Sequence, residues 1–150
     1  CIVNRYIYKE TDKSKLENYY AKMRDPVRKN NDQINTEMGL ESPLLSPSLL
    51  AFKNLFYEMD AHLKTNLWLA GETYSLADIA LVVYLTRMSS FQMAPLWKDL
   101  KYLCTWFDKI QNRCAYHKAV IDWGDVTAKK RETEGLAAFE TVKSLWNNAE

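Results

Sequence analysis

Apolar residues recur at intervals of three and four along most of this 150-residue chain. This spacing places them on one face of an α-helix, and no strand-like alternation of apolar and polar residues extends beyond a few positions. The stripes cover residues 16–38, 49–63, 100–114 and 136–146. They predict an all-α fold, a bundle of five to six helices that bury one face against one another.

Residues that favour helix starts precede several of these stripes. Ser14 and Glu17 have the spacing of a capping box. Ser46-Pro47 fits an N-cap followed by a proline in the first turn. Asp25-Pro26 fits either an N-cap with proline at the first helical position or a kink inside one long helix.

Glycines mark the expected helix ends. Gly39 and Gly71 stand where a helix is expected to stop, because glycine adopts the left-handed conformation that closes a helix. With the start signals, these positions predict the element boundaries. We expect helices over roughly 14–38, 47–65, 75–90, 98–114 and 126–147, with a short turn near 116–122.

The stretch WLAGETYSLADIALVVYL, residues 68–85, places a short polar turn before an apolar run. Ser75 and Asp78 have capping-box spacing, so each side chain is expected to accept a hydrogen bond from the backbone amide of the other residue. Tyr74 and Ile79 are placed to form the accompanying hydrophobic staple. Because the run lacks charge on every face, we expect a central helix surrounded by others, whose first amides need buried partners.

Charge and composition exclude several function classes. The chain carries 20 basic and 19 acidic residues that are interspersed, so no surface for nucleic acid is predicted. No apolar run has the length of a membrane span, and no signal peptide is visible, so no membrane partner is expected. Residues 127–134 form a mixed-charge run that fits a solvated first helical turn or, alternatively, a protein-binding segment.

The cysteines and histidines indicate no metal site. Cys1, Cys104 and Cys114 are odd in number and form no C-x-x-C pair, which argues against both a disulfide framework and zinc. Cys104 and Cys114 are expected to be small buried side chains in a reducing, cytoplasmic setting. His62 and His117 are isolated, and no carboxylate pair has spacing typical of acid–base catalysis.

Two segments resemble the C-terminal helical domain of the glutathione transferases. Residues 68–85 are similar to the family segment in which a Gly, a polar turn and Ser/Thr-x-x-Asp-Ile open the central helix. The following helix, LKYLCTWFDKIQNRCAYHKAV, has the family's usual relation among Leu103, Trp106, Ile110, Arg113 and Lys118-Ala119. Cys114 departs from the family's usual Pro, which leaves the helix end open. The resemblance covers residues 14–123.

The first ten residues, CIVNRYIYKE, resemble the end of the last helix in the family's N-terminal thioredoxin-like domain. Ile2, Tyr6 and Ile7 would correspond to its Ile-x-x-Tyr-Ile/Leu pattern. This implies that residues 1–10 are a remnant of that domain and that residues 11–150 form the helical domain. The alternative is an N-terminal helix in a protein without a thioredoxin-like half.

The resemblance implies the chemistry of the intact enzyme. In the family, the thioredoxin-like half holds the co-substrate glutathione and carries the Ser, Tyr or Cys that activates its thiol. It therefore implies no catalytic residue in this chain, and Cys1 lies past the region of the family's nucleophile. The intact enzyme is expected to be a cytoplasmic homodimer that detoxifies apolar electrophiles by joining them to glutathione.

The helical half of the family supplies the wall of the electrophile pocket. The positions that the resemblance implies are Tyr19, Tyr20, Met23, Arg24, Val27 and Trp146. Tyr and Met suit such a pocket, although the same residues at helical spacing also fit a core. Because Tyr19 and Tyr20 point about 100° apart on a helix, only one is expected to face a cleft. Arg24 could pair with a glutathione carboxylate, or with solvent and Asp25.

Two other functions remain open, because fold alone does not decide function. Domains of this family also act as non-catalytic protein–protein assembly modules, in translation elongation factors and tRNA-synthetase complexes. Such a module should expose a sizeable apolar patch and should not need the cleft. A helical domain without any ligand is the third reading.

Overall fold

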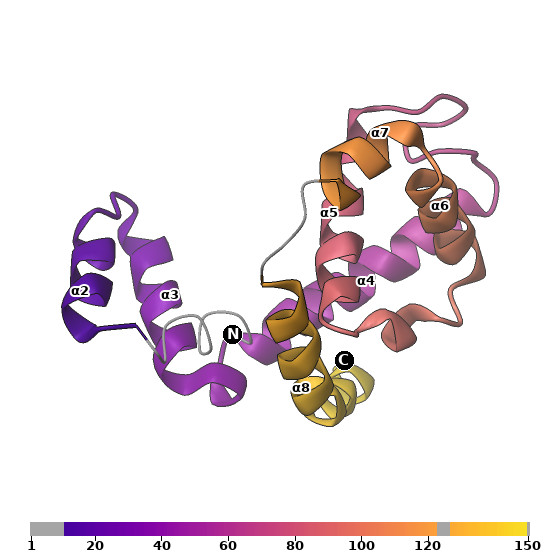
Figure 1. The fold of residues 1–150 in the computed structure, drawn as a ribbon. Helices are drawn as coiled ribbons and strands as arrows, with labels where there is room; N and C mark the ends of the chain where they lie inside the picture. The colour runs from indigo at the N-terminus through magenta and orange to yellow at the C-terminus, as the bar shows by residue number, and fades with distance from the viewer. Residues whose placement is uncertain (1–10, 123–126, 150) are drawn as a thin grey trace. The chain divides into compact units, whose positions relative to one another are not determined.

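The computed structural model describes residues 11–122 and 127–149, which are mainly helical (Figure 1). The all-α prediction is confirmed. The residues fall into two compact units, Cys1–Leu50 with Ala137–Glu150 and Ala51–Leu136. The remnant expected over residues 1–10, with Cys1, Ile2, Tyr6 and Ile7, lies outside the described residues.

In the first unit, α2 (Lys13–Ala21) and α3 (Pro26–Met38) form a helical hairpin (Figure 1). The region expected as helix over 14–38 is therefore interrupted. The side chain of Asp25 accepts hydrogen bonds from the amides of Val27 and Arg28 at 2.9 and 3.2 Å, and proline follows at the first helical position. Of the two readings of Asp25-Pro26, the N-cap is correct.

The cap of α2 differs from the prediction. The N-cap is Asp12, whose carboxylate accepts a 3.0 Å hydrogen bond from the amide of Ser14. The expected box of Ser14 and Glu17 is therefore wrong, because the helix begins at Lys13, two residues before the start that a Ser14 N-cap would give. An aspartate two residues before the expected cap takes the capping role and accepts from the amide of Ser14 itself.

The apolar stripe over 16–38 does not form one buried face. Tyr20 is buried, whereas Val27 and Met38 are 67% and 42% exposed. The chain changes direction between α2 and α3. Residues spaced three or four positions apart across this break therefore do not lie on one helix face. At the end of α3, Gly39 has φ +56°, as expected for a closing glycine.

Helix α4 (Leu45–Leu63) begins before the predicted start. Ser46-Pro47 lies inside its first turn, where proline is tolerated because the first amides have no intrahelical partner, so Ser46 is not the N-cap. Gly71 was expected to end a helix, but α4 already ends at Leu63. With φ +111° this glycine closes a turn in which Trp68 and Gly71 exchange two backbone hydrogen bonds of 2.8 and 3.0 Å.

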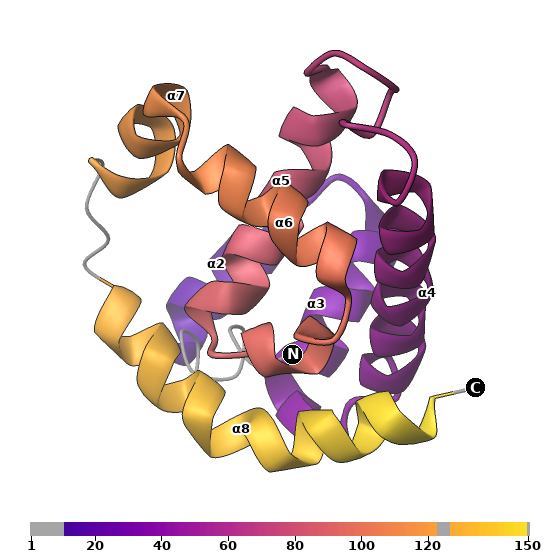
Figure 2. The ribbon, with the colours of Figure 1, turned by 90° about the vertical axis from the view of Figure 1, so that its right-hand side faces the viewer.

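In the second unit, α5 (Leu76–Ser90) and α6 (Lys101–Gln111) lie side by side (Figure 2). A 3-10 turn, Ala94–Trp97, connects them. The buried side chains of this unit include Phe56, Met59, Leu63, Val82, Leu85, Phe91, Trp97, Leu103, Trp106, Phe107 and Ile110. Much of this core lies on the stripes predicted over 49–63 and 100–114.

Helix α5 is not enclosed on every face as expected. Leu76, Ile79 and Val83 are 81%, 47% and 54% exposed, whereas Val82 and Leu85 on another face are buried. The uncharged run correctly indicates an apolar helix. It does not determine how many neighbours the helix has, because that number depends on distant segments.

The chain after α6 forms α7 (Cys114–Tyr116), a π-helical turn (His117–Ile121) and α8 (Ala128–Asn148). Because α6 ends at Gln111, Cys114, the last residue of the predicted 100–114 stripe, lies outside this helix and is exposed, contrary to the expectation of burial. The stripe predicted over 136–146 is correct in part, because Val142 and Trp146 are buried. Leu136 is 60% exposed, and the buried positions are Gly135, Ala138, Val142, Trp146 and Ala149.

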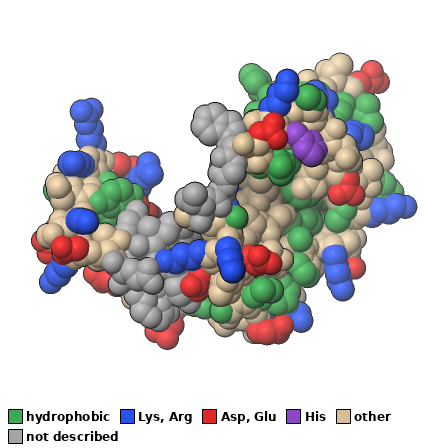
Figure 3. Space-filling view, in the orientation of Figure 1, with side chains coloured by type: hydrophobic (Ala, Val, Ile, Leu, Met, Phe, Trp, Pro, Cys, Tyr) green, Lys and Arg blue, Asp and Glu red, His purple; other side chains and the backbone are tan. Residues whose placement is uncertain are grey.

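The surface carries both signs of charge. Lys and Arg side chains are interspersed with Asp and Glu over the face in Figure 3. Among the described residues, no helix is both long enough and apolar enough to cross a membrane.

Candidate functional site

The predicted capping box is present at the start of α5. The Asp78 carboxylate accepts hydrogen bonds from the amide and the hydroxyl of Ser75, both at 2.9 Å. The Ser75 hydroxyl in turn accepts a 3.2 Å hydrogen bond from the amide of Ala77. These bonds satisfy amides that would otherwise lack partners at a helix start.

Asp78 also binds two groups that the sequence analysis did not identify. Its Oδ1 accepts from the amide of Leu69 at 3.0 Å and from the indole Nε1 of Trp106 at 2.8 Å. The side chain is fully buried. Burial alone would raise the pKa of Asp78, but the hydrogen bonds from Leu69, Trp106 and Ser75 outweigh it and lower the pKa below 3.8. The ionised carboxylate is therefore a structural centre of the second unit.

A cation–aromatic cluster holds the loop that precedes the box. The guanidinium of Arg113 lies 3.8 Å from the ring centre of Tyr74, and the ammonium of Lys109 lies 5.0 Å from that of Trp68. Trp68 and Tyr74 pack edge to face, with centroids 5.1 Å apart. Such contacts contribute about 0.5–1 kcal/mol each at partly exposed sites. The loop is thus attached to the end of α6 and to Arg113.

Three of the six predicted substrate-binding residues line one pocket. This pocket, about 440 Å³ in volume, lies at the turn between α2 and α3. Its lining residues are Tyr19, Lys22, Met23, Arg24, Asp25 and Arg28. We call it the hairpin pocket. Its three cations outnumber its one carboxylate, and Tyr19 and Met23 add apolar surface, so it suits an anion with an apolar body.

The other three predicted residues lie elsewhere. Tyr20 is buried and its hydroxyl donates a 2.9 Å hydrogen bond to Thr36 Oγ1, which ties α2 to α3. Only Tyr19 of the two tyrosines therefore lines the pocket. Val27 is exposed and Trp146 is buried, and neither contributes to the lining. Lys22 and Arg28 were missed, although both are basic residues within one helical turn of predicted positions.

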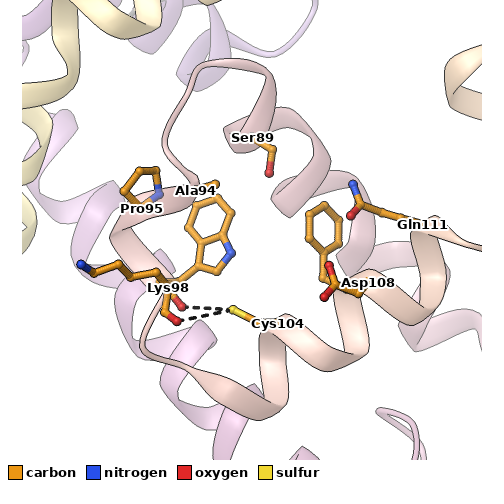
Figure 4. A pocket seen from close by; sticks show the side chains of 9 residues that line it. Ser89, Ala94, Pro95, Lys98, Cys104, Asp108 and Gln111 are labelled. Atoms are coloured by element: carbon orange, nitrogen blue, oxygen red, sulfur yellow. Dashed lines mark hydrogen bonds between the residues drawn. The ribbon is translucent and has the colours of Figure 1, made fainter.

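A larger cavity, of about 600 Å³, lies between the end of α5, the 3-10 turn and α6 (Figure 4). We call it the α5–α6 cavity. Its lining residues are Ser89, Ala94, Pro95, Trp97, Lys98, Cys104, Phe107, Asp108 and Gln111. The sequence analysis did not identify it, because its walls come from three elements whose packing no local pattern specifies.

Cys104 in this cavity is not an activated nucleophile. Its thiol approaches the carbonyl oxygens of Trp97 and Lys98 at 3.5 and 3.9 Å. Burial, and then the negative charges of Asp108, Asp60 and Asp99, raise the pKa of the Cys104 thiol above 9.0. Thiolate is the reactive form, so this environment suppresses reactivity. Across the described part of the chain, no group of three or more His, Cys, Asp or Glu side chains could hold a metal ion.

The segment that contains the capping box, α5 and α6 matches a known family. Residues 49–113 match the family model of the glutathione S-transferase C-terminal domain. Within this transferase-type domain lie Asp78, its partners and the α5–α6 cavity, whereas the hairpin pocket lies before it.

The chain is also similar to FtsZ-localized protein A of Caulobacter vibrioides (strain NA1000 / CB15N), with 34% identity over 64 residues. That match covers 43% of this chain and 28% of the relative, so less than a third of the relative's length is matched. No solved structure gives a significant match. The comparisons therefore support the transferase-type domain without assigning a reaction.

Proposed function

We propose that this chain supplies the helical, acceptor-binding part of a glutathione transferase-like enzyme that conjugates glutathione to apolar electrophiles. The observation that carries the proposal is the transferase C-terminal domain over residues 49–113. In the proposed reaction the glutathione thiolate attacks the electrophile, and a thioredoxin-like domain holds and activates the thiol. This chain is assigned no catalytic residue, and the intact enzyme is proposed to be a cytoplasmic homodimer.

The hairpin pocket is proposed to position the acceptor. Tyr19 and Met23 would contact the apolar body of the electrophile, because a tyrosine ring and a flexible thioether adapt to irregular ligands. Arg24 and Arg28 would pair with a glutathione carboxylate, since guanidinium groups form charge-assisted hydrogen bonds with carboxylates. Holding both reactants in this way accelerates a bimolecular step.

The test is steady-state kinetics of the full natural polypeptide with glutathione and a dinitrophenyl halide. Met23→Ala is expected to raise KM for the halide about fivefold while leaving KM for glutathione unchanged, because only the electrophile would contact Met23. Met38→Ala is the matched control, since Met38 is partly exposed and lies outside the pocket lining. Equal effects of Met23→Ala on both substrates would indicate packing instead. Absence of any conjugation would reject the enzyme.

A second candidate function is a non-catalytic assembly module. It is favoured by the exposed apolar residues Leu76, Ile79 and Val83 on α5, since such patches commonly bind proteins. The relative's name refers to localisation with FtsZ, so FtsZ polymers are the partner to test. Val83→Ser should abolish co-sedimentation with these polymers, whereas Val27→Ser should not. Failure of the unmodified chain to co-sediment would reject this candidate.

A further inference from the structure

The α5–α6 cavity contains a buried polar atom that the protein leaves unsatisfied. The hydroxyl oxygen of Ser89 is buried and has no hydrogen-bond partner among the described residues. Figure 4 shows this hydroxyl directed toward the space between the lining side chains. Buried polar atoms nearly always have a partner, so an orphan that faces a cavity indicates a ligand or an ordered water there.

The polar groups around this cavity are mainly hydrogen-bond acceptors. Asp108 and Gln111 lie on the same face of α6, three residues apart, and Figure 4 shows both at one side of the cavity. The carbonyl oxygens of Trp97 and Lys98 are further acceptors that the Cys104 thiol approaches at 3.5 and 3.9 Å, and that of Trp97 also accepts a 3.0 Å hydrogen bond from the amide of Leu100. The ammonium of Lys98 points away from Asp108 and Gln111.

The electrostatic environment favours a positive charge. Asp108 lines the cavity, and Asp60 and Asp99 are close enough to affect the Cys104 thiol there. Two aromatic side chains, Trp97 and Phe107, supply apolar walls, and the faces of aromatic rings attract cations. Such a combination of carboxylate, acceptors and rings suits an ammonium group joined to an apolar body.

We propose that the α5–α6 cavity binds a small organic cation, a primary ammonium carried on an aromatic or alkyl body. The ammonium donates hydrogen bonds to the Asp108 carboxylate and the Ser89 hydroxyl, which satisfies the orphan oxygen. The apolar body occupies the space beside Trp97 and Phe107. This site is separate from the hairpin pocket, so it does not depend on the proposed transferase activity.

The test is an NMR titration of the full chain at pH 7 with three probes of the same shape. They are 2-phenylethylammonium, the neutral 2-phenylethanol and the anionic 3-phenylpropionate. The ammonium is expected to shift the backbone amide signals of Ser89 and Gln111 saturably. Its Kd should be at least about tenfold lower than that of the alcohol, because only the ammonium pairs with the carboxylate. The anion should bind most weakly.

Variants identify the groups responsible. Asp108→Asn should weaken binding of the ammonium about fivefold, as expected for a partly exposed charge pair. Asp122→Asn is the matched control, since Asp122 is exposed and does not line the cavity, and it should leave Kd unchanged. Ser89→Ala should weaken binding about threefold without lowering the melting temperature, because the hydroxyl has no protein partner to lose.

Three results would overturn the proposal. Equal affinity for the alcohol and the ammonium would leave only apolar contacts to explain binding. Equal effects of Asp108→Asn and Asp122→Asn on Kd would show that the Asp108 carboxylate does not bind the ammonium. No saturable shift at millimolar ammonium would show that the cavity does not take this class of ligand.

Discussion

The indole Nε1 of Trp106 donates a 2.8 Å hydrogen bond to Oδ1 of Asp78, and both side chains are buried. The same oxygen accepts a hydrogen bond from the amide of Leu69. One carboxylate therefore joins α6, the start of α5 and the preceding loop. This arrangement explains why a polar turn lies directly before an apolar helix.

Replacing Asp78 should destabilise the second unit strongly. Asp78→Asn removes the charge and places an amide donor near groups that already donate, so we expect the free energy of unfolding to fall by about 3 kcal/mol. Urea denaturation followed by circular dichroism measures this change. Asp99→Asn, an exposed aspartate outside the network, should change it by less than about 0.5 kcal/mol. Equal effects of the two substitutions would contradict the structural role of Asp78.

The same carboxylate should make stability depend on acid pH. The pKa of Asp78 in the folded chain lies below its ordinary value of 3.8, so the folded state favours the ionised form. Its contribution is fully present above the unfolded pKa and is lost as the pH falls through the folded pKa. Melting curves between about pH 6 and pH 2 should show this loss below about pH 4. Asp78→Asn should flatten the curve, and an unchanged slope would reject the assignment.

Cys104 should react slowly with iodoacetamide at neutral pH. Burial and the neighbouring carboxylates raise its pKa above 9.0, so less thiolate is present than in an ordinary cysteine. Peptide mass spectrometry should show its alkylation rate still rising above pH 9, while the exposed Cys114 reacts faster at pH 7. Asp108→Asn should increase the rate at Cys104 by removing a negative charge. A faster reaction at Cys104 than at Cys114 would contradict this.

Gly135 should tolerate no side chain. A Cβ atom at this position of α8 would lie 2.0 Å from the carbonyl oxygen of Phe91. Gly→Ala normally stabilises a helix interior by about 1 kcal/mol, but here α8 must move away from the Phe91 backbone. We expect Gly135→Ala to lower the free energy of unfolding by at least about 2 kcal/mol. Thr133→Ala, an exposed change in the same helix, should be neutral or slightly stabilising, and the same result for Gly135→Ala would disprove the close contact.

Sequence patterns identified the features that act over a few residues. The Ser75–Asp78 box, the range of α5 and the apolar face of α6 all follow from residues three or four positions apart. The predictions at Ser14 and Ser46 were wrong for the same reason. Several nearby residues could cap a helix, and packing elsewhere decides which one is used.

The sequence by itself determined that this chain is all-α, that Asp78 caps an apolar helix and that the transferase-type segment is present. Only the tertiary structure decided that Trp106 shares the Asp78 carboxylate, that Tyr19 rather than Tyr20 lines a pocket and that α5 exposes Leu76. Helical periodicity and capping depend on neighbours within one turn, so they can be read from the order of residues. Burial, shared hydrogen bonds and cavities depend on segments far apart in the chain, and folding alone brings those together.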